Sequence, residues 1–377
     1  MTVDPEKIRV ALDEAPIVAD IEILAKRPII EDKQLFSLSE VKLLDVKRNE
    51  TSSRFRSGTL SLQTLGGESE GIGTFFSGYP RPYVGQRYRA HLAPMGNGNY
   101  QVVGLEAGFV PLNPQRSFSR NRTDGSDGEG DGAFLFWDKS FFPIPYFIAV
   151  DTFKDLPQFV SAIDSGFQTW RNVDQVMIEF LPLGCSSSDD NQNDGLNTVI
   201  LIEKNWPFDS MAIAITRNFY IAGNSARAGL ILDSDILLNG EIHEFSTINE
   251  TGKHDVQNIV THEIGHFIGL GHEMEPTIDN DATMFRNASV NELNKRTLKE
   301  NDINGIRSAY QGVSQNKGSS LLSSSPSCFP TIGNSGCARV SRPGNSTPWP
   351  FLILLIWVLG VCPTLGRQLI RAVSTRL

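Results

Sequence analysis

The sequence predicts an α+β fold, in which a twisted, mixed and mostly parallel sheet packs against helices and follows a small β-rich barrel or sandwich. Residues 1–112 contain short apolar or alternating runs separated by glycines, which is typical of strands and tight turns. Residues 141–312 alternate between strand-like and helix-like periodicity, as expected for a sheet covered by helices. A helix expected after Asp255 carries two histidines four positions apart, so this second part also holds the best candidate for a functional site.

The composition indicates a globular protein with an uneven distribution of charge. The chain has 377 residues, 40% of them hydrophobic, and a formal net charge of −9. This length suggests about two or three domains. The negative charge is concentrated in the middle of the chain, whereas residues 313–377 contain no acidic residue. Since an acidic surface repels phosphate backbones, nucleic acid is not an expected partner. The sequence does not indicate an oligomeric state.

The first domain is predicted over residues 1–112. A small barrel or sandwich fits these residues because several short strand-like runs are joined by turn signals such as Gly66-Gly67. No catalytic arrangement occurs here, and His91 is expected to be structural. The strand-like runs lie at residues 17–24, 41–46, 59–65, 88–92 and 100–103.

Residues 113–133 are rich in glycine, aspartate, serine and arginine and are predicted to form a flexible linker. Their acidic stretch, DGSDGEGDG, lacks the ligand spacing and the terminal glutamate of an EF-hand calcium loop. Because a solvated linker leaves few contacts across it, we expect residues 134–312 to fold without residues 1–112.

The second domain is predicted over residues 134–312. Residues 156–170 show the helical spacing of apolar side chains, and residues 298–310 predict a closing helix. Asp255 is a suitable N-cap for the helix between them. The strands are expected at residues 147–150, 176–180, 198–203, 211–216 and 230–238.

The candidate site lies in the segment THEIGHFIGLGHEM. His262 and His266 are one helical turn apart on the same face, so both imidazoles can bind one zinc ion. Gly269 is expected to end the helix, because glycine adopts a positive φ at little cost, and the turn brings His272 round as a third ligand. Three protein ligands leave a fourth position for water, as in catalytic rather than structural zinc sites.

Glu263 is the candidate catalytic residue because it directly follows the first ligand. Its carboxylate is placed to take a proton from the attacking water and to pass it to the leaving amine of a peptide. The sequence thus predicts a Zn²⁺-dependent endopeptidase that hydrolyses peptide bonds in protein or peptide substrates.

The spacing HExxHxxGxxH, with Met284 twelve residues after His272, resembles the metzincin zinc metalloproteases. In that family the methionine belongs to a Met-turn and forms a hydrophobic floor under the zinc. Within the metzincins the chain is similar to the matrixins, especially secreted bacterial ones. The similar segments are residues 162–180, 228–240 and 298–310.

The resemblance implies a metzincin (zincin-like) catalytic domain that acts outside a cell, with the strand at residues 211–216 at the edge of its sheet. A peptide substrate would pair with this strand in the antiparallel direction. Residues 285–297, after the Met-turn, would line the pocket for the residue that follows the scissile bond.

Some residues depart from the matrixin pattern. Glu273 is more typical of astacins, although the tyrosine that astacins have two residues beyond the methionine is absent, so an astacin-like enzyme is one alternative. Asn301-Asp302 stand where matrixins often carry two acids. Residues 1–184 contain no cysteine, so no N-terminal thiolate can hold the zinc latent. A non-catalytic surface binding protein with a vestigial zinc site is a second alternative, which the intact Glu263 disfavours.

A calcium site is considered beside the zinc site. DNQNDG, residues 190–195, resembles half of a calcium loop but has Gln192 at its third place. Since matrixins often bind structural calcium, Ca²⁺ is a second candidate metal, with a plain polar loop as the alternative. His243 and His254 lie outside the zinc motif and are expected at the surface.

The end of the chain resembles a stalk and an anchor. Residues 313–350 are rich in serine, glycine and proline, and residues 351–377 are predicted to be a hydrophobic membrane or sorting segment with a basic end. Arg367, Arg371 and Arg376 follow its apolar centre, as the positive-inside rule expects for a cytoplasmic end. A buried C-terminal helix or strand is the alternative.

We therefore expect an extracellular or cell-surface protein that is anchored or sorted by its tail. No apolar stretch follows a basic one near the N-terminus, so no signal peptide is visible, and export implies a start further upstream. Cys328 and Cys337 are close enough to form a disulfide in an oxidising compartment, or they are free thiols.

Overall fold

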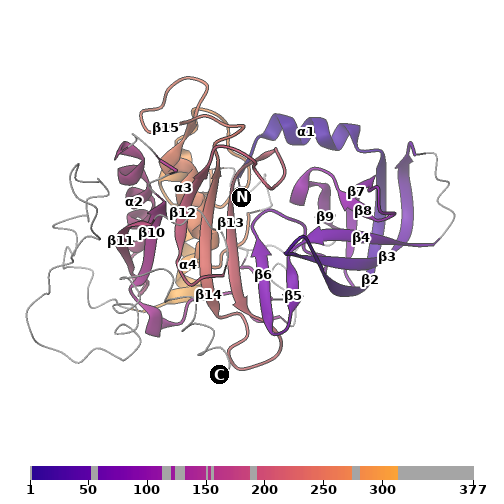
Figure 1. Ribbon diagram of the computed structural model, residues 1–377, viewed down its shortest axis with the longest axis horizontal. Helices are drawn as coiled ribbons and strands as arrows, with labels where there is room; N and C mark the ends of the chain where they lie inside the picture. The colour runs from indigo at the N-terminus through magenta and orange to yellow at the C-terminus, as the bar shows by residue number, and fades with distance from the viewer. Residues whose placement is uncertain are drawn as a thin grey trace, which may run out of the picture. The chain divides into compact units, whose positions relative to one another are not determined.

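The computed structural model describes most of the first 312 residues (Figure 1). The predicted stalk and tail, with Cys328 and Cys337, lie outside the described residues. Within the described part, no helix is both long enough and apolar enough to cross a membrane. The described ranges are residues 2–51, 58–112, 120–123, 132–149, 152–153, 157–186, 193–273 and 281–312.

The first sheet is mixed, as predicted, but it is not mostly parallel, because four of its seven strand pairings are antiparallel. Its strands follow the order β11-β10-β12-β14-β13-β6-β5, and a short strand β1 also pairs with β13. β11, β10, β12 and β14 run parallel to one another, whereas β13, β6, β5 and β1 join through antiparallel pairs. The strands are β1 (Thr2–Val3), β5 (Gly67–Ser69), β6 (Ile72–Phe76), β10 (Ile144–Ala149), β11 (Phe180–Ser186), β12 (Thr198–Ile202), β13 (Ala212–Ile221) and β14 (Ile231–Asn239).

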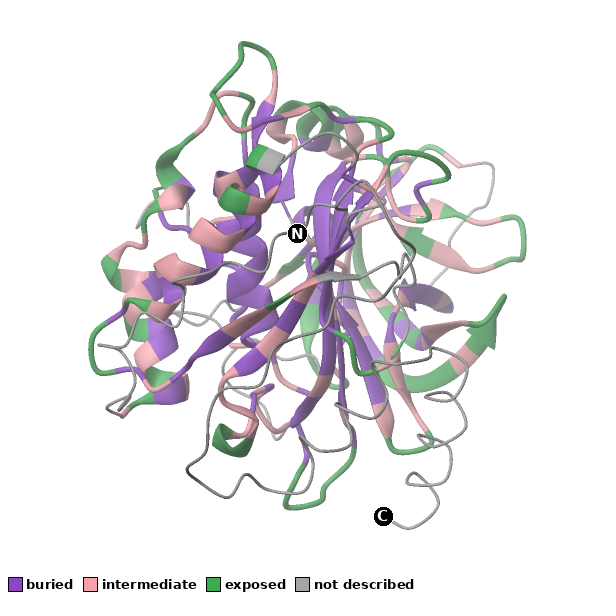
Figure 2. Ribbon diagram, turned by 60° about the vertical axis from the view of Figure 1, so that its left-hand side comes forward, coloured by how far each residue is buried: buried purple, intermediate pink, exposed green. Residues whose placement is uncertain are grey.

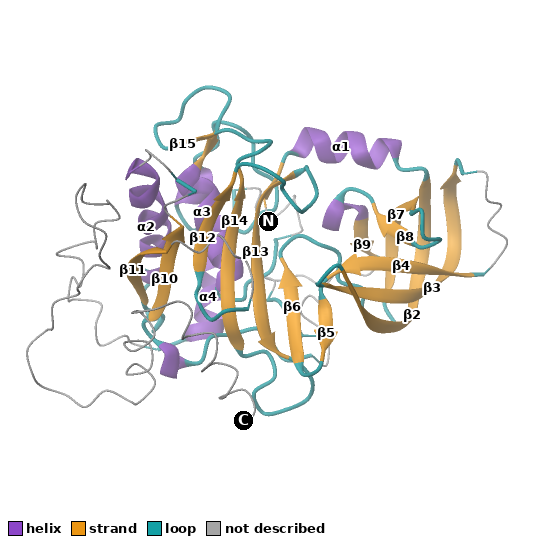
Figure 3. Ribbon diagram, viewed as in Figure 1, coloured by secondary structure: helices purple, strands orange, loops and turns teal. Residues whose placement is uncertain are grey.

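Three helices cover one face of this sheet: α2 (Pro157–Arg171), α3 (Val256–Phe267) and α4 (Glu300–Tyr310) (Figures 1 and 3). α3 is buried along nearly its whole length, and its predicted N-cap is confirmed because Asp255 accepts a hydrogen bond from the Asn258 backbone. Trp170 of α2 donates to the carbonyl oxygen of Thr261 over 2.7 Å. The main core lies between these helices and the sheet, where most strand residues are buried (Figure 2).

The second sheet closes into a barrel, one of the two architectures expected for residues 1–112. Its strand order is β2-β3-β4-β8-β7-β9, and an additional β2–β7 pairing closes the ring. Alternate residues of β2, beginning at Ile17, are buried inside it. The strands are β2 (Ile17–Glu31), β3 (Gln34–Asn49), β4 (Thr59–Leu65), β7 (Arg87–Pro94), β8 (Tyr100–Val102) and β9 (Phe109–Pro111), and helix α1 (Pro5–Glu14) precedes them.

The expectation of few contacts between residues 1–112 and the second domain is wrong. After β4 the chain leaves the barrel, and β6 pairs antiparallel with β13 from Arg217 to Ile221. Gly73 lies opposite Tyr220 in this pairing, and a Cβ at position 73 would meet the tyrosine ring at 2.1 Å. The missing side chain therefore allows the two segments to form one continuous sheet.

Part of the predicted flexible linker is also packed. The backbone N–H of Asn121 donates to the carbonyl of Gly269, and its side-chain amide donates to that of Leu270. Asn121 and Thr123 are buried. The local sequence is polar, which suggested a solvated segment, but here the polar groups satisfy backbone carbonyls of another segment.

Some element boundaries differ from the prediction. β2 and β3 continue well beyond their apolar runs, because backbone pairing extends the hairpin through exposed charged residues. Val176 makes only an isolated bridge, and β11 begins at Phe180. His243 and His254 are buried rather than exposed, with their rings 5.3 Å apart.

The other elements are short. They are the paired β15 (Phe245–Ser246) and β16 (His254–Asp255), and the 3₁₀ helices η1 (Leu105–Gly108), η2 (Lys139–Phe141) and η3 (Asn294–Arg296).

Candidate metal centre

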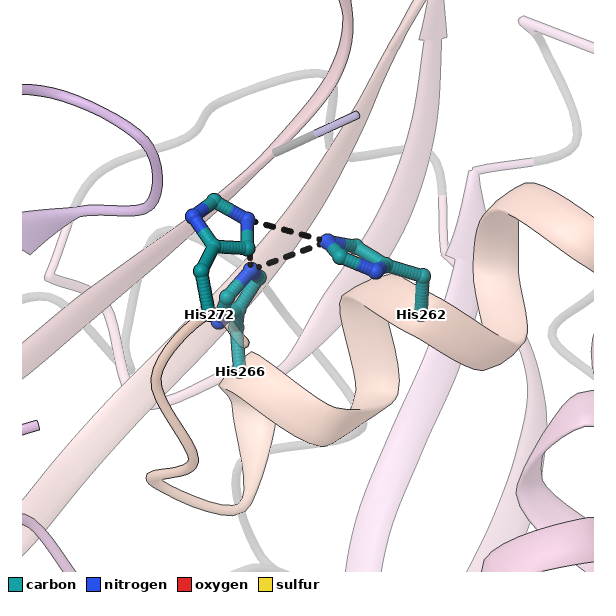
Figure 4. A group of neighbouring side chains, drawn as sticks. All are labelled: His262, His266 and His272. Carbon is teal, nitrogen blue, oxygen red and sulfur yellow. Dashed lines mark hydrogen bonds between the residues drawn. The ribbon is translucent and has the colours of Figure 1, made fainter. Parts of the chain in front are cut away.

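Three histidine side chains converge beside α3 (Figure 4). His262 and His266 project from the helix, and His272 reaches the same point from the segment that follows it. The three Nε2 atoms lie 3.0–3.1 Å from one another. The structure thus brings together the three residues that the sequence motif predicted as ligands.

Gly269 makes this approach feasible. Its φ is +91°, and a Cβ at this position would meet the carbonyl oxygen of Leu135 at 2.4 Å. A side chain is therefore excluded both by backbone strain and by space. The turn is closed by the backbone N–H of Gly269, which donates to the carbonyl of His266.

The other ring nitrogen of each histidine faces an oxygen acceptor. Nδ1 of His262 lies 2.6 Å from the carbonyl oxygen of Thr283, and Nδ1 of His266 lies 2.8 Å from that of Leu270. Nδ1 of His272 lies 2.7 Å from Oε2 of Glu106. These oxygens accept hydrogen bonds, so each Nδ1 carries the proton and each Nε2 presents a lone pair.

The triad fits a bound zinc ion. Burial lowers the pKa of His262 and of His266 well below the usual histidine value, so both rings are neutral and able to bind a metal. The three Nε2 atoms are 3.0–3.1 Å apart, and their lone pairs repel each other unless a cation lies between them. Nitrogen ligands of a tetrahedral zinc ion lie roughly 3.3 Å apart. Among the described residues, these histidines form the one group of metal-binding side chains.

Met284 lies against helix α3 at Gly265. It is buried, and its sulfur occupies the space that a Cβ on Gly265 would take. Asp302 of α4 holds the turn, because its carboxylate oxygens accept hydrogen bonds from the backbone N–H groups of Thr283 and Met284. The same turn supplies the carbonyl that orients His262, so α4 supports the triad through Asp302.

Glu263 is fully buried and is held by three donors from different segments. Oε2 accepts from the hydroxyl of Thr216 over 2.8 Å and from that of Ser77 over 3.4 Å. Oε1 accepts from the backbone N–H of Thr2 over 3.0 Å. The carboxylate therefore lies between α3 and β13. The expectation that residues 211–216 form the edge of the sheet is wrong, because β1, β6 and β14 all pair with β13.

Residues 137–311 match the family model of the matrixins, peptidase family M10. These residues form a matrixin domain. No curated protein matches the chain. The match favours a matrixin over the astacin alternative. Matrixins are zinc metallopeptidases, and the histidine triad of this domain provides a place for the metal.

The departures from the matrixin pattern contact each other. The side-chain amide of Asn301 donates to Oε2 of Glu273, the residue that follows the third histidine. The backbone N–H of Glu273 also donates to the carbonyl of Met284. An acid at position 301 would set two carboxylates together, so Asn301 and Glu273 are compatible as a pair in this matrixin domain.

Sequence reasoning missed the residues that support the triad from a distance. Glu106, Ser77 and Thr216 carry no local pattern that links them to the zinc motif. Asp302 was noticed only as a departure in the closing helix. The calcium prediction gains no support, because half of its loop, residues 190–192, lies outside the described residues. Among the described residues, the histidine triad is the one group of side chains that could hold a metal ion.

We predict that Glu106→Ala weakens zinc binding by about 10- to 100-fold, because His272 loses the acceptor that fixes its tautomer and orientation. Glu106→Gln keeps an acceptor oxygen and should lose less. Glu40→Ala, at an exposed position of the barrel, is the control. Competition with a chromophoric chelator measures the affinity. Unchanged affinity in a folded Glu106→Ala protein would show that Glu106 does not orient the ligand.

We also predict that Asn301→Asp destabilises the fold at pH 7 by about 1–3 kcal/mol, because it replaces a hydrogen bond with a carboxylate pair. Two carboxylates repel each other only when both are ionised, so the loss should be smaller at pH 4 than at pH 7. Asn304→Asp, exposed on the same helix, is the control. Denaturant unfolding at pH 7 and at pH 4 tests this; equal stability of both variants at pH 7 would contradict it.

Proposed function

We propose that this chain is a zinc-dependent endopeptidase that hydrolyses peptide bonds in proteins. One observation carries the proposal: the Glu263 carboxylate is held between the histidine triad and strand β13. A general base, a metal site and a strand whose backbone can pair with a peptide therefore meet in one place. The matrixin match over residues 137–311 supports the same reaction class.

His262, His266 and His272 would hold the zinc ion through their Nε2 atoms. When bound, zinc polarises the scissile carbonyl and lowers the pKa of a water molecule. Glu263 takes a proton from the attacking water and then passes it to the leaving amine nitrogen. The hydroxyl of Thr216 keeps Oε2 of this carboxylate aimed at the groove during both transfers.

The substrate backbone binds between two segments of the domain. Residues 212–214 of β13, which pair with β1 in this structure, have backbone groups beside Glu263, and residues 286–288 have backbone groups on the other side of the groove. A substrate would take the place of β1. A peptide lying there gains main-chain hydrogen bonds to both sides, so the domain can bind extended segments of varied sequence. This favours an endopeptidase acting on unfolded or exposed protein segments.

We predict that Glu263→Gln keeps zinc but lowers hydrolysis of casein by about 10²- to 10⁴-fold, because the amide cannot accept the proton. Zinc content is measured together with casein clearing, with and without a chelator. Incubation lasts for hours, since the site is buried in the folded chain. Glu40→Gln, at an exposed position, is the control. A zinc-loaded Glu263→Gln protein with full activity would contradict the mechanism; zinc binding without chelator-sensitive hydrolysis would favour the vestigial alternative.

We further propose an extracellular or cell-surface location, with residues 351–377 as the membrane or sorting segment. The support is the order of features in the sequence: a stalk, an apolar run and then basic residues. We predict that in its native host the full chain sediments with membranes or the cell wall, whereas a chain ending at Gln311 does not. Equal, cytoplasmic distributions of the two proteins would contradict both parts of this proposal.

A further inference from the structure

A strand of the chain itself lies in the groove beside the triad. β1 pairs antiparallel with β13, so that Thr2 lies opposite Ala214 and Val3 opposite Ala212. On its other side, Val3 forms a parallel bridge with Asn287. The backbone N–H of Val3 donates to the carbonyl of Arg286, and the N–H of Ala288 donates to the carbonyl of Val3. β1 is therefore hydrogen-bonded on both edges.

β1 has the direction expected of a bound peptide. The proposed substrate pairs antiparallel with the strand at residues 211–216, and β1 pairs with that strand in the same sense. The backbone N–H of Thr2 donates to Oε1 of Glu263 over 3.0 Å. An amide nitrogen of the chain thus contacts the carboxylate that would protonate the leaving amine.

The strand leaves no space for a second peptide. Thr2 is fully buried, Val3 is 2% exposed, and Glu263 is fully buried with them. Val3 belongs to the same apolar cluster as Ile8 of α1 and Ile215 of β13. The same hydrogen-bonding groups of β13 and of residues 286–288 cannot serve β1 and a substrate together.

We propose that Thr2–Val3 is an internal pseudosubstrate that keeps the peptidase latent until β1 leaves the groove. The inference rests on the peptidase function proposed above. The blocking element in this structure is a backbone strand that runs in the substrate direction. The two residues also indicate what the positions after the scissile bond accept, namely threonine followed by a buried aliphatic side chain.

Val3→Asp in the full chain tests the proposal. A carboxylate at this buried position disfavours docking of β1, whereas Val10→Asp places the same charge on the exposed face of α1 and is the matched control. Two readouts are hydrogen exchange of the amides at residues 212–216 and hydrolysis of a quenched fluorescent peptide with Thr-Val after the scissile bond. We expect both rates to rise at least about tenfold in Val3→Asp and neither to rise in Val10→Asp.

If Val3→Asp does not fold, an engineered disulfide between β1 and β13 provides a second test. Cysteines replace Thr2 and Ala214, which are paired directly opposite each other in β1 and β13. The oxidised protein should hydrolyse the peptide at less than about a tenth of the rate of the same protein after reduction. Hydrogen exchange of the amides at residues 212–216 should also be slower in the oxidised protein than in the reduced protein.

The outcomes separate the two proposals. Equal rates of hydrogen exchange and of hydrolysis in Val3→Asp and Val10→Asp would overturn the pseudosubstrate proposal. Equal rates in the oxidised and reduced forms of the disulfide variant would overturn it as well. Faster exchange without hydrolysis by any zinc-loaded form would contradict the peptidase function and therefore a latency role. Faster exchange together with chelator-sensitive hydrolysis would support both.

Discussion

The arrangement of this site depends on where three imidazole protons are held. Each Nδ1 lies within hydrogen-bond distance of an oxygen, and so each Nε2 lone pair is turned toward the same point. The three oxygens come from the Met-turn, from the turn after α3 and from η1 of the barrel segment. One small cluster of nitrogen atoms is therefore stabilised by parts of the chain that are far apart in sequence. The contacts of Asp302, Asn121 and Glu106 can all be understood as support for these oxygens or for the turns that carry them.

The features that sequence reasoning predicted well are local ones. The histidine spacing, the glycine turn and the Asp255 cap each depend on a few consecutive residues, because helix geometry relates positions three or four apart. The same holds for β4, whose predicted and observed bounds agree. Met284 could be assigned because its distance from the motif is short.

The features that were missed depend on register between distant segments. Nothing in the local sequence of β6 shows that it leaves the barrel and pairs with β13, since its apolar pattern suits either sheet. Glu106 is one acid among many until the fold places it against His272. In the sequence Asn121 looks like part of a polar linker. Its hydrogen-bond acceptors are backbone carbonyls, which every residue has, so no sequence pattern marks them. Pairings of this kind are set by tertiary packing, which a single sequence does not reveal.

The pairing of β6 with β13 also affects how the chain can be assembled. About 140 residues separate the two strands, so a growing chain presents β6 long before its partner has been synthesised. During that interval the strand carries unpaired backbone groups and apolar side chains, which is the usual template for edge-to-edge association. Long loop closures of this type are also slow. Biogenesis of this protein is thus most exposed to aggregation between the completion of the barrel and the arrival of β13.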